Sequence, residues 1–115
     1  MRETFHLVPE EVWSALDPAN AYVAPSLGTE GFIHCTDGVA PLGETFARYY
    51  ARDPRPFLAL TVDLDAVDAL GVPWRYDVAG SPYPHIYGPI ERSAILEVSR
   101  VDRAPDGRFA GLSPA

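Results

Sequence analysis

Short apolar runs separated by prolines and glycines make up most of this sequence. Residues 4–8 (TFHLV) predict a first strand, and residues 57–62 (FLALTV) are so uniformly apolar that they predict a central strand buried on both faces. Residues 94–101 alternate apolar and polar positions, which is typical of a strand with one buried face. Shorter extended segments are predicted at 31–36 and at 72–78. The pattern is therefore rich in strands.

Helical spacing fills several of the gaps between these runs. Residues 9–16 place a proline at a helix start, followed by two acids and an apolar face. Apolar positions recur at spacings of 3, 4 and 3 within residues 39–49, and a short helical turn is predicted at 63–70. Residues 20–30 contain a proline and a glycine, and we expect them to be irregular.

The order of these elements predicts the fold class. Strands and helices do not alternate as βαβ units, and no repeat or linker divides residues 1–115. We therefore expect a single α+β domain with a split, mostly antiparallel, curved sheet and two or three short helices. Residues 4–101 form the expected ordered core, and residues 103–115, poor in apolar side chains, are expected to be a flexible tail.

Charge and cysteine content exclude several classes of function and location. Nine basic against 16 acidic residues give a net charge of −7, which argues against nucleic acid as a partner. No apolar run approaches the roughly 20 residues of a membrane span, and the first residues carry no apolar signal segment. Cys35 is the only cysteine, so an intrachain disulfide is impossible. Together these features predict a cytoplasmic protein without a membrane segment.

Three histidines, His6, His34 and His85, lie among apolar residues. Each could be a core histidine with a local hydrogen-bond partner, a metal ligand, the base of a Cys35 nucleophile, or part of a ligand cleft. Adjacent strand residues point to opposite faces, so His34 and Cys35 cannot readily share one ion or one reaction. We therefore predict that no metal is bound and that Cys35 is a buried thiol without a role in chemistry.

The cleft interpretation uses the neighbours of these histidines. His34 and Thr36 share a strand face, and Tyr87 follows His85 after one residue. Arg75 and Asp77 are also two residues apart, which fits either an anion-binding pair or an ion pair on an edge strand. We predict that His6, His34 and His85 converge on one cleft, where imidazoles and hydroxyls hold the ribose or phosphate groups of a small-molecule nucleotide.

Four motifs together resemble one family: FHLV at 5–8, PSL at 25–27, EGFIHCT at 30–36 and PHIYGP at 84–89. Over residues 4–101 the chain resembles the bacterial family called domain of unknown function 952, which is grouped with the ADP-ribosyltransferase-like superfamily. The resemblance implies a split-sheet fold that holds NAD in a cleft. It further implies an NAD-dependent glycosyl (ADP-ribosyl) transferase-like or phosphotransferase-like enzyme. The alternative is a non-catalytic interaction or nucleotide-sensing domain that retains the cleft.

The resemblance also implies roles for single residues. His6 matches the first-strand position that binds the NAD ribose, and the string Ile-His-Cys-Thr, which holds His34 and Thr36, is similar to a strand of RNA 2′-phosphotransferases. Glu91 and Glu97 are the candidates for the catalytic acid on a late strand. The expected catalytic residues are His34, His85 and Glu91. The expected cofactor contacts are His6, His34, Thr36, Arg75, Asp77 and Tyr87.

Overall fold

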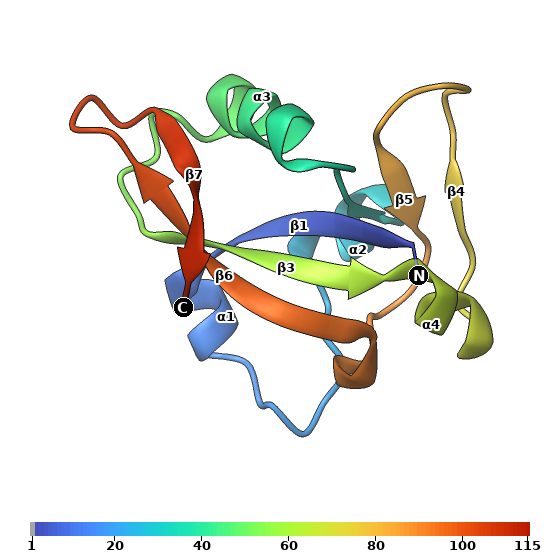
Figure 1. Ribbon diagram of the computed structural model, residues 1–115. Helices are drawn as coiled ribbons and strands as arrows, with labels where there is room; N and C mark the ends of the chain where they lie inside the picture. Colours follow the sequence, from blue (N-terminus) through green and yellow to red (C-terminus); the bar gives the residue numbers. More distant parts are fainter. Residues whose placement is uncertain (1) are drawn as a thin grey trace.

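Two antiparallel sheets organise the computed structural model, which describes residues 2–115 (Figure 1). The larger sheet has the order β1-β3-β6-β7, built from β1 (Glu3–Pro9), β3 (Phe57–Asp63), β6 (Ile95–Arg103) and β7 (Phe109–Pro114). The smaller sheet has the order β2-β5-β4, built from β2 (Ile33–His34), β5 (Pro84–Ile86) and β4 (Trp74–Tyr76). The predicted α+β domain with a split, antiparallel sheet is confirmed.

Short helices connect the strands. They are α1 (Glu10–Ser14), α2 (Pro25–Glu30), α3 (Val39–Tyr49) and α4 (Leu64–Ala69), with a 3-10 turn, η1, at Arg92–Ala94. The described residues thus hold four α-helices rather than the expected two or three. Both α3 and α4 lie where the apolar spacing predicts them. None of the helices in residues 2–115 is long and apolar enough to span a membrane.

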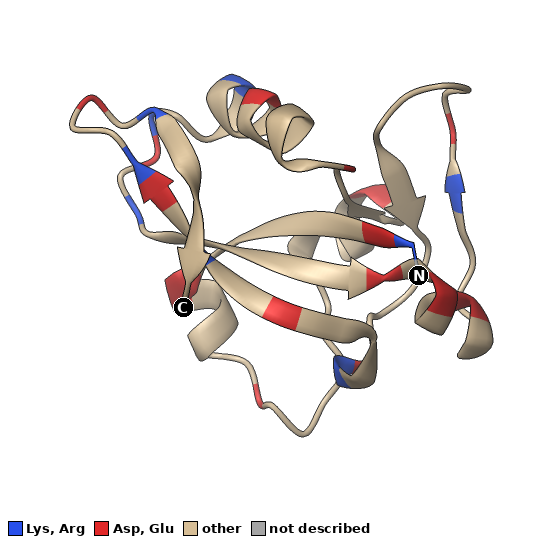
Figure 2. Ribbon diagram, in the orientation of Figure 1, with Lys and Arg blue, Asp and Glu red and all other residues tan. Residues whose placement is uncertain are grey.

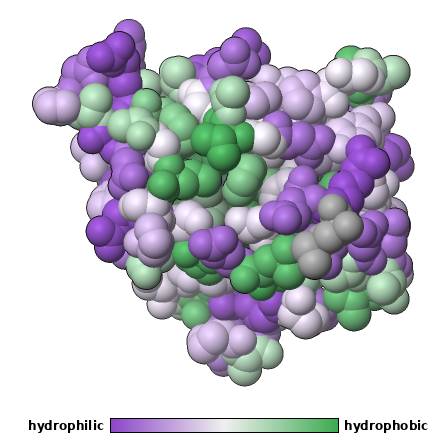
Figure 3. Space-filling view, in the orientation of Figure 1, coloured by the Kyte–Doolittle hydropathy of each residue, from purple (hydrophilic) through white to green (hydrophobic). Residues whose placement is uncertain are grey.

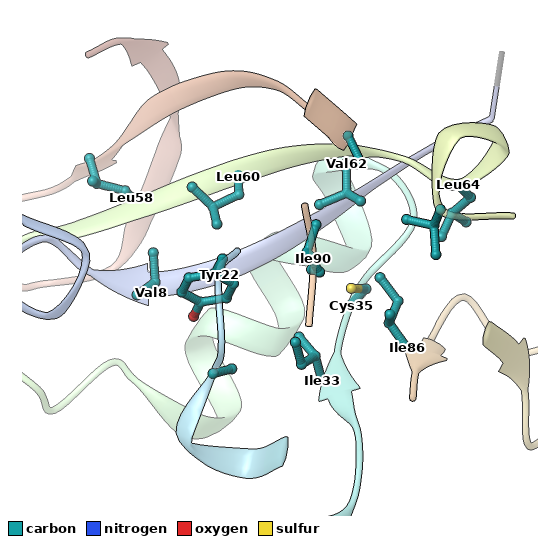
Figure 4. Packing of buried hydrophobic residues seen from close by; sticks show 13 residues of the cluster. Val8, Tyr22, Ile33, Cys35, Leu58, Leu60, Val62, Leu64, Ile86 and Ile90 are labelled. Carbon is teal, nitrogen blue, oxygen red and sulfur yellow. The ribbon is translucent and has the colours of Figure 1, made fainter. Parts of the chain in front are cut away.

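The central strand β3 has both faces buried, as its apolar sequence predicts. Leu58, Leu60 and Val62 pack into the main core between the two sheets, where Figure 4 shows them opposite the smaller sheet. Phe57 and Ala59 point to the other face and pack beneath α3. Because β1 and β6 pair with β3 on either side, its backbone is also enclosed by hydrogen bonds.

The two sheets are joined by backbone hydrogen bonds between β1 and the residues that follow β2. The amide of Phe5 donates to the carbonyl of Thr36 (2.9 Å), and the amide of Thr36 donates to the carbonyl of Phe5 (2.8 Å). The expected strand at 31–36 is therefore shorter than its sequence indicates. Regular pairing with β5 ends at His34, and Thr36 pairs with the larger sheet instead.

The prediction that residues 20–30 are irregular is wrong, because they contain α2. Pro25 occupies the first turn of this helix, where its missing N–H costs no hydrogen bond. Gly31 ends the helix with φ of 87°, a left-handed conformation that glycine adopts without steric cost. Of the two residues that we expected to disrupt structure, Pro25 begins the helix and Gly28 lies within it.

The expected flexible tail at 103–115 is also corrected by the structure. Residues 109–114 form β7, which pairs with β6 through Val101 opposite Leu112 and Arg103 opposite Phe109. Phe109 and Leu112 pack against the buried cluster under α3. Two apolar side chains and backbone pairing are thus sufficient to order a segment that otherwise consists of small and polar residues.

We expect Phe109→Ala to lower the free energy of unfolding by about 2 kcal/mol, below the roughly 3–5 kcal/mol lost at a fully buried phenylalanine. The ring of Phe109 is half-buried and lies 6.0 Å from that of Phe46. Urea denaturation followed by circular dichroism measures the change, and Phe109→Leu is the control that keeps most of the apolar volume. An unchanged midpoint for Phe109→Ala would show that β7 is not docked on the core.

Candidate functional site

His34, His85 and Arg75 form one cross-strand row on the smaller sheet. His34 of β2 lies opposite His85 of β5, and His85 lies opposite Arg75 of β4. Side chains alternate along a strand, so the neighbouring Ile33 and Ile86 point the other way, and both are fully buried in the main core. The histidine row therefore occupies the outer face of the smaller sheet.

Aromatic rings bring the row together. Phe32 stacks on the imidazole of His85, with ring centroids 4.0 Å apart and planes at 13°. Phe32 also makes a T-shaped contact with His34, with ring centroids 4.7 Å apart, and the centroids of the two imidazoles are 5.4 Å apart in a second T-shaped contact. Tyr87 lies 5.5 Å from Phe32. These contacts fix the ring planes and leave the half-exposed edge of His34 facing solvent.

Asp77 holds three of these side chains at once. Its Oδ1 accepts from Nε of Arg75 (2.6 Å), and its Oδ2 accepts from Nδ1 of His85 (2.6 Å) and from the hydroxyl of Tyr87. The guanidinium of Arg75 also lies 4.2 Å from the ring centre of Tyr87. These donors, Tyr87 first, hold the pKa of the Asp77 carboxyl well below its usual range, so the carboxylate is ionised. We call Phe32, His34, Arg75, Asp77, His85 and Tyr87 the surface cluster.

Each imidazole of the surface cluster is held by a carboxylate through one nitrogen. Nδ1 of His85 donates to Asp77, and Nε2 of His34 donates to Glu30 (2.9 Å). Within residues 2–115, Nε2 of His85 and Nδ1 of His34 make no hydrogen bond. In a neutral ring these second nitrogens are acceptors, and in a protonated ring they are donors. The pair can therefore accept hydrogen bonds from hydroxyls or bind an anion.

His6 lies behind this face and does not share it. The side chain is buried, its Nδ1 bonds the carbonyl of His34 (2.6 Å) and its Nε2 bonds the hydroxyl of Tyr22 (2.7 Å). Burial lowers its pKa to about 4, so the ring is neutral near pH 7. A carbonyl can only accept, so Nδ1 carries the proton and Nε2 accepts from Tyr22. The structure thus brings two of the three predicted histidines together and places the third beneath them.

Thr36 and Cys35 are also buried rather than at the surface. The hydroxyls of Thr36 and Thr45 share a hydrogen bond (3.2 Å) under α3. The expected common face of His34 and Thr36 is wrong because the chain changes sheets between them. The predicted burial of Cys35 is confirmed, and this burial raises the pKa of its thiol.

The two late glutamates lie away from the surface cluster. Glu91 is exposed beside η1, and Glu97 lies on β6 opposite Thr61. No hydrogen bond or ion pair in the described chain joins either carboxylate to the surface cluster. Besides Asp77, which belongs to the cluster, the carboxylate that contacts it is Glu30. Sequence reasoning missed Glu30, whose approach to His34 depends on the turn at Gly31.

The surface cluster is exposed on the sheet and is separate from two hollows of the molecule. One hollow, of about 280 Å³, lies on the larger sheet, and one of about 410 Å³ lies beside Arg103. Neither is lined by a residue of the surface cluster. Between residues 2 and 115 no three His, Cys, Asp or Glu side chains are placed to hold a metal ion. Figure 2 shows the opposite charges along β4 and the loop that follows it.

The fold and the site together define an antiparallel two-sheet α+β protein with paired histidines on its smaller sheet. Residues 7–98 match the model of the family described as "Protein of unknown function (DUF952)", and the chain belongs to this family. Among curated proteins, none matches the chain.

Solved structures of Protein CC0527 from Caulobacter crescentus have a similar fold. Its X-ray structure has a TM-score of 0.74 at 19% identity, covering 95% of this chain and 94% of that one. Its solution NMR structure has a TM-score of 0.70 at 20% identity, covering 94% and 91%. At this identity the likeness concerns the fold alone.

We expect Asp77→Asn to lower the pKa of Tyr87. The hydrogen bond to the Asp77 carboxylate is the main cause that raises the pKa of this phenol, and a neutral amide removes its negative charge. A pH titration of the Tyr87 ring by ¹³C NMR measures the shift. Asp68→Asn removes the same charge at an exposed position on α4 and is the matched control. An equal shift in both variants, or none in Asp77→Asn, would contradict the arrangement.

We expect His6 to make the protein less stable as the pH falls from 6.5 to about 4. The unfolded chain takes up a proton near the ordinary histidine pKa, whereas the folded protein resists protonation until about pH 4. Stability from this group is therefore complete above pH 6.5 and is lost by about pH 4, a change of about 3 kcal/mol.

The measurement is the free energy of unfolding across this range for wild type and His6→Gln. The His6→Gln variant should show the shallower fall. An identical slope in wild type and His6→Gln would mean that His6 titrates freely in the folded protein.

Proposed function

We propose that the surface cluster binds NAD or a related small nucleotide, and that the chain is related in fold to ADP-ribosyltransferase-like enzymes. The observation that carries this proposal is the pair of imidazoles, His34 and His85, each with one nitrogen held by a carboxylate and the other unshared. Ribose hydroxyls can donate to both unshared nitrogens. The split antiparallel sheet is compatible with the proposed superfamily.

The rest of the surface cluster suits the other parts of a nucleotide. Phe32 and Tyr87 offer ring faces and edges for stacking of a base, a contact that contributes about 1–3 kcal/mol per base in nucleic-acid complexes. The guanidinium of Arg75, with 63% of its side chain exposed, supplies positive charge beside the imidazoles for a phosphate. His6 and Thr36, both buried, act in this proposal by positioning the strand rather than by touching the ligand.

In a transferase-like reaction His85 is the proposed proton-transfer residue. Asp77 fixes Nδ1 as the protonated nitrogen, so Nε2 is free to take the proton of an acceptor hydroxyl while its oxygen bonds C1′ of the NAD ribose, the C1′–N bond breaks and nicotinamide leaves. His34 is the proposed partner that binds the second hydroxyl. Glu30 is the carboxylate of this site closest to His34, and it replaces Glu91 in the proposal as the group that stabilises oxocarbenium character.

One observation favours a second candidate, a nucleotide-sensing domain without catalysis. Neither Glu91 nor Glu97, the acids expected on a late strand, contacts the surface cluster. A sensor needs the binding contacts and not the acid. Both versions of the proposal, enzyme and sensor, take a small nucleotide as the partner and place the protein in the cytoplasm.

Titration of the ¹⁵N-labelled protein with NAD, ADP-ribose and AMP tests the binding proposal. Amide shifts should concentrate at residues 32–34, 75–77 and 85–87. Phe32→Ala should weaken binding about tenfold, through lost stacking. Tyr49→Ala removes an exposed ring on α3 and should change the affinity less than about twofold. Shifts elsewhere, or equal effects of the two variants, would reject the surface cluster as the nucleotide site.

An assay for release of nicotinamide from NAD then distinguishes the enzyme proposal from the sensor proposal. Turnover that His85→Gln abolishes while NAD binding persists supports the transferase-like version. Saturable NAD binding without nicotinamide release, in the presence of candidate acceptors, supports the sensor.

A further inference from the structure

A second candidate site lies on the larger sheet, on the part of one face that α3 leaves uncovered. Strand alternation puts Phe5, Thr61 and Glu97 on this face, in one cross-strand row. In the next row, Leu7 and Ala59 lie under α3 in the second buried cluster, whereas Ser99, opposite Ala59, lines the hollow. Beyond the helix the face opens into the hollow of about 280 Å³. The hollow is therefore a consequence of how far α3 reaches across the sheet.

Two largely buried residues, Thr61 and Ser99, present unpaired hydroxyls to the hollow. Thr61 is 5% exposed and Ser99 is 7% exposed. Neither hydroxyl makes a hydrogen bond within residues 2–115, whereas the nearby Ser113 donates to Asp102 (2.8 Å). Neither oxygen is among the buried polar atoms that lack a partner, so both hydroxyls are accessible from the hollow and can bond a polar group that enters it.

The walls of the hollow combine negative charge with apolar surface. Glu3 and Glu97 line it, and neither carboxylate has an ion-pair or hydrogen-bond partner in the described chain. Figure 2 shows these acidic positions on β1 and β6. The adjacent cation, Arg2, donates instead to the hydroxyl of Tyr76 (2.7 Å). Phe5 and Leu112 supply the apolar surface. On the face of the molecule drawn in Figure 3, hydrophobic residues form short patches bordered by hydrophilic ones.

We propose that this hollow binds a small aliphatic diamine. Its ammonium groups pair with Glu3 and Glu97, its N–H groups donate to the hydroxyls of Thr61 and Ser99, and its methylene chain lies against Phe5. The volume of about 280 Å³ is just below the roughly 300–1,000 Å³ of ligand pockets, which restricts the occupant to a short chain. A hard metal ion fits less well, because one side of the hollow is apolar and only two carboxylates line it.

NMR titration with 1,4-diaminobutane tests the proposal, with 1,4-butanediol as the neutral molecule of the same shape. The diamine should saturate and shift the amides of residues 61, 97, 99 and 112, and the diol should not. Glu97→Gln should weaken binding about tenfold through loss of a charge-assisted hydrogen bond. Thr61→Val, which keeps the side-chain shape, should also weaken binding.

Glu10→Gln is the matched control, because it removes one exposed carboxylate of α1 outside the hollow. It should change the affinity less than about twofold. Spectra of each variant show directly whether it is folded. Equal weakening by Glu10→Gln and Glu97→Gln would mean non-specific attraction to an acidic protein and would overturn the proposal. Failure to saturate at millimolar diamine, or equal shifts with Mg²⁺, would also overturn it.

Discussion

The structure depends on the hydrogen bonds between β1 and the segment at residues 32–36. Phe5 and Thr36 exchange both backbone bonds, and one residue further along β1 the ring of His6 bonds the carbonyl of His34. Without these contacts the smaller sheet would be tied to the larger one mainly by apolar packing, which carries little directional information. With them, the buried ring of His6 holds the backbone carbonyl of His34, and the His34 side chain points away from the core.

This junction explains why a functional site can exist on so small a sheet. Three strands of two or three residues cannot hold side chains rigidly by themselves. The buried His6 and Tyr22 anchor β2 from behind, and the Asp77 carboxylate links β4 and β5 from the front. The surface cluster is therefore held on both sides, which is the condition for precise placement of a binding group.

The sequence predicted correctly those features that depend only on residues close together in the chain. The burial of β3, the helix α3 and the pairing of Arg75 with Asp77 follow from spacing within a few residues. The stacking of Phe32 on His85 does not, because it depends on which distant strand pairs with β2. The hydrogen bond between His6 and Tyr22 could not be predicted either, because Tyr22 is distant in the chain and lies in a stretch without regular structure. The strand β7 was not predicted, because it is ordered by backbone pairing with β6 and its own composition does not indicate a strand.

The protonation state of His6 tests the central claim most directly. A long-range ¹H–¹⁵N correlation spectrum of the imidazole rings at neutral pH distinguishes the two neutral forms and the charged form. We expect Nδ1 of His6 to carry the proton, because it donates to the carbonyl of His34, and Nε2 to be unprotonated, because it accepts from Tyr22. A proton on Nε2, or a charged ring, would contradict the account, because the bond that joins β1 to the carbonyl of His34 could not then exist as described.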